Sequence, residues 1–237
     1  MRKFSMRKFS LIRASLLFSM GLTSSIISSI PIAIPGMLGA KIPRANREQT
    51  HRQKGFFEKF FGDRERRGGS RSPFCSIVPS PNLGSILWNN MPLLVWKTKR
   101  GVTVKKIAIV NFDTEETIWS EDNIDPAQQF LVYTGMPLAS GEYQYKVVYE
   151  LNQKEFPTEI DFDIMAEGDR DRMARELQQR ASQNPNLSPE ELALQRADVF
   201  ADAKLWVDGL QELFALQNPS PILVGELQKL RNSLCQD

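Results

Sequence analysis

The sequence predicts an α+β fold in which an antiparallel β-sandwich precedes a helical region. Segments 142–151 and 155–165 alternate apolar and polar residues with a period of two. This pattern is typical of antiparallel strands that are buried on one face and solvated on the other. From residue 166 onward the apolar residues follow a helical spacing instead. The chain has 237 residues, 41% of them hydrophobic, which is enough for one sizeable domain or two small ones.

Residues 1–40 are predicted to be a signal peptide. Basic residues at the start precede a long uncharged run that Pro31 and Pro35 interrupt, and the small residues Gly39 and Ala40 fit a cleavage site. An uncleaved membrane anchor is the alternative, because the uncharged run is long enough to span a bilayer. Either way, the leader predicts export to the periplasm or the extracellular space.

Residues 41–72 are predicted to be a basic, disordered linker, since they are rich in charge and follow no sustained period. Within them, GFFEKFFG places four aromatic residues at a helical spacing: Phe56, Phe57, Phe60 and Phe61. This short aromatic face could touch a membrane or fold back on the folded part. The preferred interpretation is a short apolar cluster within a flexible tether. Residues 1–72 thus predict proximity to a membrane.

Residues 73–165 are predicted to form the sandwich. Turns rich in proline, asparagine and glycine separate short strand candidates, and 152–154 joins the last two strands as a hairpin. In LASGEYQY, Leu138, Gly141 and Tyr143 resemble the turn and tyrosine that open a late strand of immunoglobulin-like domains. Trp96 would then be the core tryptophan of an earlier strand. The sandwich is therefore predicted to be immunoglobulin-like.

Residues 166–237 are predicted to be helical. Ser188-Pro189-Glu190-Glu191 combines a serine cap, a proline at the first position and a glutamate that reaches back, which together favour a helix start. Asn218-Pro219 ends the next helical stretch, and Ser220-Pro221 begins the last helix.

The spacing of five residues in this region is close to that of a tetratricopeptide unit: Phe200, Trp206, Gly209, Leu213 and Pro221. Gly209 would let two helices cross closely. A peptide-binding hairpin of this kind makes Phe200, Trp206 and Asp208 the candidate partner-binding residues. The preferred alternative is a hairpin packed against the sandwich, with the aromatic residues in the core.

Few residues suggest catalysis or metal binding. The only histidine is His51, in the predicted linker, which disfavours Ser-His-Asp, Cys-His and histidine-rich metal sites. No glycine-rich loop is placed to bind phosphate, so no cofactor is expected. Glu159, Asp161 and Asp163 could hold calcium on one strand face, but a solvated sheet face is the preferred interpretation. A non-enzymatic protein is therefore expected.

The charges and cysteines bear on partners and compartment. The net charge of +2 combines a basic first third with an acidic remainder, which argues against a nucleic-acid-binding folded part. Cys75 and Cys235 flank the folded part. In an oxidising compartment they could form a disulfide, and two unpaired thiols are the equal alternative.

The order GGSRSPFC, NLG, PLLVW, SGEYQYKVVY and ADVFADAKLWVDGLQEL resembles the cyanobacterial "domain of unknown function 928" family over about residues 67–217. The resemblance implies export, a β-rich half and a helical end, and no known activity. Lys204 stands where the family usually has glycine. The second family cysteine has no counterpart near Glu150, so the family's disulfide is not carried over.

We therefore expect an exported, non-enzymatic protein-interaction module of the cell envelope. Its partner would be an unidentified envelope protein, contacted through the helical hairpin or an exposed sheet edge. The alternatives are an envelope-tethered structural protein, whose basic linker lies near anionic lipid, and a carbohydrate- or calcium-binding sandwich.

Overall fold

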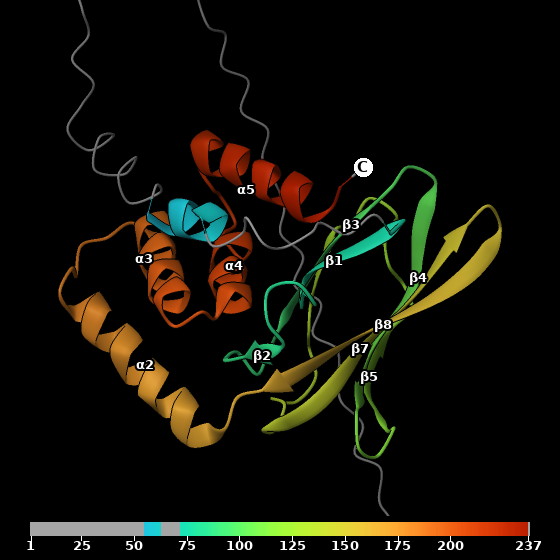
Figure 1. Ribbon diagram of the computed structural model, residues 1–237, viewed down its shortest axis with the longest axis horizontal. Helices are drawn as coiled ribbons and strands as arrows, with labels where there is room; N and C mark the ends of the chain where they lie inside the picture. Colours follow the sequence, from blue (N-terminus) through green and yellow to red (C-terminus); the bar gives the residue numbers. More distant parts are fainter. Residues whose placement is uncertain (1–54, 63–71, 237) are drawn as a thin grey trace, which may run out of the picture. The chain divides into compact units, whose positions relative to one another are not determined.

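A computed structural model describes residues 55–62 and 72–236 of this chain, and these belong to one compact unit, Ile42–Asp237. Their fold is α+β, with two β-sheets and a set of helices (Figure 1). The predicted signal peptide, residues 1–40, and most of the predicted linker lie outside the described residues.

The strands divide between two sheets. A three-stranded sheet has the order β1-β3-β6: β1 (Phe74–Val78), β3 (Leu93–Thr98) and β6 (Phe130–Val132). A five-stranded sheet has the order β2-β8-β7-β4-β5: β2 (Ile86–Leu87), β8 (Lys154–Ile164), β7 (Gly141–Leu151), β4 (Val102–Asn111) and β5 (Thr117–Glu121). The pairs are antiparallel except β2–β8, which is parallel.

The predicted hairpin is the pair β7–β8. Its register runs from Gly141 opposite Ile164 to Leu151 opposite Lys154, and the two turn residues both have positive φ, 52° at Asn152 and 61° at Gln153. Two such residues are what a tight turn with the right twist requires. The alternation predicted for β7 is confirmed, because its tyrosines and Val147 are buried while its polar residues are not.

The two sheets pack against each other through aromatic rings. Phe74 of β1 stacks on Tyr149 of β7 with ring centroids 5.8 Å apart, and Trp119 of β5 meets Tyr133, just after β6, at 5.4 Å. Trp96 of β3 is fully buried in the same core. This arrangement is consistent with the predicted β-sandwich.

The helical region has the predicted elements: α2 (Glu167–Ser182), α3 (Pro189–Asp202), α4 (Trp206–Phe214) and α5 (Pro221–Leu234). The predicted capping box at the start of α3 is present, since the Ser188 side chain accepts a hydrogen bond from the Glu191 amide and the Glu191 carboxylate accepts one from the Ser188 amide. Ser220 caps α5 by accepting from the Leu223 amide. Both helix starts follow from local side-chain chemistry.

Helices α3, α4 and α5 share one hydrophobic core with the two sheets, and Leu177 of α2 belongs to a second, smaller cluster. The Gln211 side chain in α4 accepts a hydrogen bond from the Leu93 amide in β3 at 2.8 Å. A disulfide joins Cys75 in β1 to Cys235 at the end of α5, with Cα atoms 5.8 Å apart, so the two cysteines are paired in this structure. The sandwich and the helical region are therefore not independent units.

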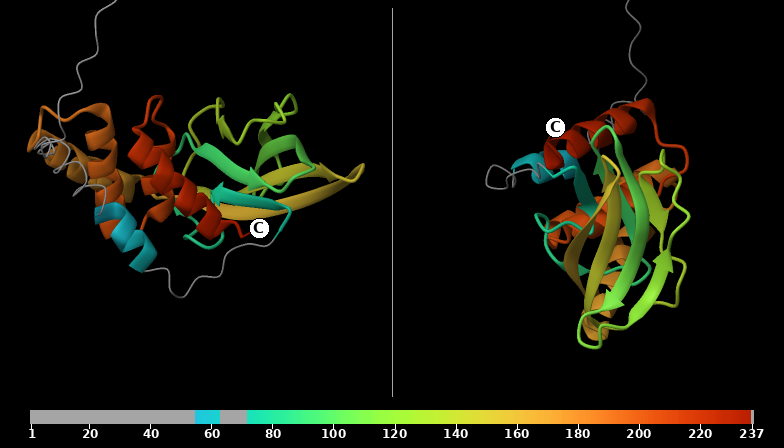
Figure 2. Two further views of the ribbon diagram at one scale, coloured as in Figure 1. Left: turned by 90° about the horizontal axis from the view of Figure 1, so that it is seen from above. Right: turned by 90° about the vertical axis from the view of Figure 1, so that its right-hand side faces the viewer.

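The predicted disordered linker contains one folded segment, which corrects that prediction for residues 55–62. These residues are helical, and Phe56, Phe57 and Phe60 are at most 3% exposed (Figures 1 and 2, cyan). Phe57 and Phe60 surround Phe56, at centroid distances of 5.3 and 6.0 Å. The high charge of the linker as a whole predicts disorder, but residues 55–62 bury enough apolar surface to become ordered.

Candidate functional site

The three predicted partner-binding residues are core residues in this structure. Phe200, Trp206 and Asp208 are 0%, 2% and 1% exposed, so none of them faces solvent in this structure, in which residues 55–62 cover Trp206. This corrects their assignment as a contact surface and agrees with the alternative in which the hairpin's aromatic residues pack inside. The contacts that these three residues make with other parts of the chain define the candidate site.

Asp208 fastens the loop between β2 and β3 to helix α4. Its two carboxylate oxygens accept hydrogen bonds from the backbone amides of Trp88 and Asn89, both at 2.9 Å. Burial raises the pKa of Asp208 to about 7, against the opposite effect of these amide donors, and the nearby Glu212 adds to the increase. Sequence patterns did not indicate this role, because the two donors lie about 120 residues away.

Phe200 supports the same loop from helix α3. Its ring lies 5.4 Å from that of Trp88, whose indole N–H donates to the Arg170 carbonyl in α2. After Phe200 the helix ends at Lys204, which has a φ of 62°. The Lys204 amide donates to Ala201 and the next amide, of Leu205, donates back to Phe200. This is the helix-ending motif in which the left-handed position favours glycine.

Trp206 contacts the helix formed by residues 55–62, which belongs to the same chain. The rings of Phe56 and Phe60 lie 6.2 and 5.6 Å from the Trp206 ring, both edge-on. Lys59 lies on the exposed side of the same helix, and its ammonium group pairs with the carboxylates of Asp198 at 3.1 Å and Asp202 at 2.8 Å. We call the four residues that receive this segment the acceptor surface: Asp198 and Asp202 of α3, and Trp206 and Gly209 of α4.

Gly209 makes room for Phe56. A Cβ atom at residue 209 would lie 2.8 Å from Phe56 Cε2 and 3.2 Å from the Ala197 carbonyl oxygen in α3. The predicted close crossing of two helices at Gly209 is thus present, and the docked segment uses the same space.

Gly209→Ala is accordingly expected to lower the free energy of unfolding by about 1 to 3 kcal/mol, because overpacking outweighs the gain in helix propensity. Gly225→Ala in α5 is the matched control, since its Cβ would meet nothing within 4 Å. That variant should gain up to about 1 kcal/mol. Urea unfolding of both proteins measures the difference, and equal shifts would contradict the packing argument.

A second candidate surface is the open edge of β6. In its antiparallel register, Phe130 and Val132 lie opposite Val95 and Leu93 of β3. The hydrogen bonds from the Trp96 amide to Gln129 and from the Tyr133 amide to Pro92 show which residues face β3. The amides and carbonyls of Phe130 and Val132 therefore point away from β3, and the Phe130 carbonyl accepts a hydrogen bond from the Gln128 side-chain amide at 2.7 Å. Their side chains are 50% and 52% exposed, and Met136 in the next loop is 83% exposed.

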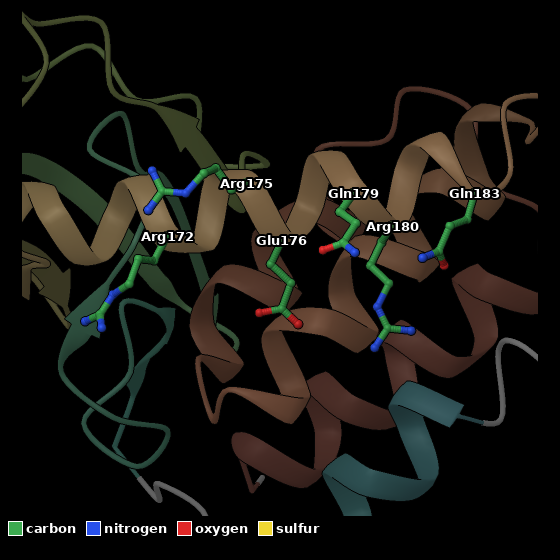
Figure 3. A pocket seen from close by; sticks show the side chains of 6 residues that line it. All are labelled: Arg172, Arg175, Glu176, Gln179, Arg180 and Gln183. Carbon is green, nitrogen blue, oxygen red and sulfur yellow. The ribbon is translucent and has the colours of Figure 1, made fainter.

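The remaining charged surfaces give less support for a binding site than the acceptor surface and the β6 edge do. Of the three calcium candidates, Glu159 pairs with Lys146 and Asp161 accepts from the Gln144 side-chain amide. No cluster of metal-ligating side chains occurs in the described part of the chain. Figure 3 shows a depression lined by side chains of α2 and of its C-cap residue Gln183: Arg172, Arg175, Glu176, Gln179, Arg180 and Gln183. One exposed helix and its C-cap residue supply all of them, so no second wall encloses a ligand there.

Comparisons with known proteins assign no family. No family model matches the chain, and no curated protein matches it. Among solved structures, the sulfur carrier protein SoxY from Chlorobium limicola f thiosulfatophilum aligns with 46% of this chain and 94% of its own, at 13% identity and a TM-score of 0.27. A likeness this low carries no functional argument. Within residues 55–62 and 72–236, no helix has the length and apolar character that crossing a membrane requires.

Proposed function

We propose that this chain is an exported, non-enzymatic protein-interaction module of the cell envelope, which binds a partner through the open edge of β6. The observation that carries the proposal is an edge strand with outward backbone groups beside two half-exposed apolar side chains, Phe130 and Val132. Natural proteins usually protect such an edge with charge or proline, because it readily pairs with another strand. An extended, apolar segment of a partner would extend the sheet here.

The proposed sandwich is immunoglobulin-like. The chain order of β1, β3 and β6 in one sheet and β4, β5, β7 and β8 in the other agrees with the connectivity of such domains, with β2 as an addition. The Tyr143 hydroxyl donates to the Ala139 carbonyl at 3.0 Å, as in a tyrosine corner at a late strand. The pair α3–α4, crossing closely at Gly209, supports a tetratricopeptide-like hairpin.

Export and the family resemblance belong to the same proposal. The disulfide Cys75–Cys235 is compatible with an oxidising compartment. The left-handed Lys204 provides a physical reason for the glycine that the cyanobacterial family usually has there. The buried rings of Phe56, Phe57 and Phe60 are not available to a bilayer, which argues against membrane contact by this part of the linker.

Placing charge on the edge tests the proposal. Phe130→Lys/Val132→Lys is expected to reduce partner recovery from envelope extract at least about tenfold, because a lysine edge opposes strand addition. Ile222→Lys/Val224→Lys in α5 is the matched control, since those side chains are 57% and 49% exposed. Recovery is measured by quantitative affinity capture with the folded proteins.

The comparison of the two variants decides the result. Partners lost with the β6 variant and retained with the α5 variant support the edge as the binding surface. Retention with both folded variants would show that β6 is not the contact.

A further inference from the structure

We propose that the acceptor surface is a binding site for an amphipathic helix of a partner protein, and that residues 55–62 occupy it in cis. The partner helix would carry aromatic residues at the spacing of Phe56, Phe57 and Phe60, with a basic residue at the position of Lys59. This site is separate from the β6 edge and is independent of that proposal.

The segment 55–62 has the properties of a bound peptide. Eight residues are too few to be a stable helix in water, so the helix depends on the surface that receives it. Its contacts are of the kind that peptide helices make in a groove: aromatic anchors on one face and a charged residue at the rim. The hydrogen-bonded strands of the sandwich begin only at Phe74, well after the segment.

The acceptor surface selects both shape and charge. Gly209 leaves a space that the ring of Phe56 fills, and any larger residue there would displace it. Trp206 presents its ring to Phe56 and Phe60 together. Asp198 and Asp202 stand one turn apart on α3, and Lys59 bridges both. A basic residue is therefore preferred at that position of the partner helix, and an acidic one is disfavoured.

Occupation in cis controls access. A short tether gives the segment an effective concentration on the order of millimolar at the surface. A partner helix must therefore compete with this segment. The apparent affinity of the partner helix is its intrinsic affinity multiplied by the fraction of time that the surface is open. Weakening the segment, without touching the surface, should expose the site.

The test uses the full chain and a labelled peptide of residues 53–64. Phe56→Ala/Phe60→Ala in the chain removes the two cis anchors that contact Trp206, leaves Phe57, and keeps all four acceptor residues. Fluorescence anisotropy is expected to show at least about tenfold tighter peptide binding to this variant than to the wild type. A peptide with the same two alanines is the matched control and should not bind. If the folded variant binds the intact peptide no better than the wild type does, the proposal is wrong.

Charge exchange tests the rim. In the same variant chain, a Lys59→Glu peptide should bind several-fold more weakly than the intact peptide, because it meets Asp198 and Asp202. Adding Asp198→Lys/Asp202→Lys to the chain should reverse that preference. An unchanged preference would contradict the assignment of Lys59 as a recognition residue.

Hydrogen exchange of the wild type decides the matter if the double alanine variant does not fold. A ligand-like segment opens locally, so the amides of residues 55–62 should exchange faster than those of β7, and added peptide should not protect β7. Exchange of the segment only through global unfolding, at the same free energy as β7, would make it ordinary core and overturn the proposal.

Discussion

Removing the disulfide between Cys75 and Cys235 is expected to lower the free energy of unfolding by about 5 kcal/mol. The two cysteines are 160 residues apart, and closing a loop of that size in the unfolded chain removes about this much conformational free energy. Both side chains are buried, at 5% and 3% exposure, so Cys75→Ala/Cys235→Ala is preferable to serine, which would bury a hydroxyl. Urea unfolding of the oxidised wild type and the variant measures the loss.

Reduction provides the control for this prediction. The wild type in excess reductant should approach the stability of the double alanine variant, and adding reductant to the variant should change nothing. A loss below about 1 kcal/mol would contradict the loop-closure argument. A loss confined to hydrogen exchange of α5 would mean that the bond only restrains the end of that helix.

The stability of this protein is expected to fall as the pH rises from about 4 to about 7, and Asp208 is the reason. Its pKa is raised from 3.8 in the unfolded chain to about 7 in the folded protein, so between these values the folded state binds more protons. Folding is therefore favoured at acidic pH, and the advantage is lost as the pH rises through the folded pKa. The full effect is on the order of 4 kcal/mol.

Asp208→Asn isolates this contribution. An amide of nearly the same shape does not titrate, so the difference in unfolding free energy between wild type and variant should change across this pH range. The difference in unfolding free energy at any one pH is less informative. The NH₂ group of the asparagine would face one of the two backbone donors, Trp88 or Asn89, and would place two donors together. Parallel profiles for the two proteins from about pH 4 to about pH 7 would show that Asp208 is not the titrating group.

Both predictions concern the junction between the helices and the sheets. Asp208 and Gln211 hold α4 against the loop before β3, while the disulfide holds the end of α5 against β1. A carboxylate buried at a junction and bonded to backbone amides specifies how the two parts meet. We therefore expect the strands and the helices α2 to α5 to unfold in one cooperative transition.

Local patterns explain which elements were predictable. The alternation in β7 and at the end of β8, where Phe162 and Ile164 are buried, depends on a few neighbouring residues, as do the turn at 152–153 and the capping box at Ser188. In the first half of β8 the alternation fails, because Phe156 is 39% exposed. The edge character of β6 was less accessible. A strand of three residues has almost no periodicity, and only its position in the sheet leaves Phe130 and Val132 exposed.

Contacts between distant residues explain what was missed. GFFEKFFG has the same helical spacing whether it lies on a membrane, in a tether or in a protein core, and only Trp206, Gly209 and the two aspartates of α3 decide between them. In the same way, nothing near Asp208 in the sequence reveals the two amides that it accepts. Trp206 was selected as a contact residue, and its contact proved to be within the chain.

The sequence by itself determined the order of a β-rich half and a helical half, the strand faces and the helix starts, because these depend on backbone preferences and on neighbours a few residues apart. Only the tertiary structure decided that Cys75 meets Cys235, that residues 55–62 belong to the folded unit, and that Asp208 is buried. Those outcomes depend on which surfaces meet after collapse, and burial, rather than residue type, then determines whether a ring or a carboxylate is core or contact.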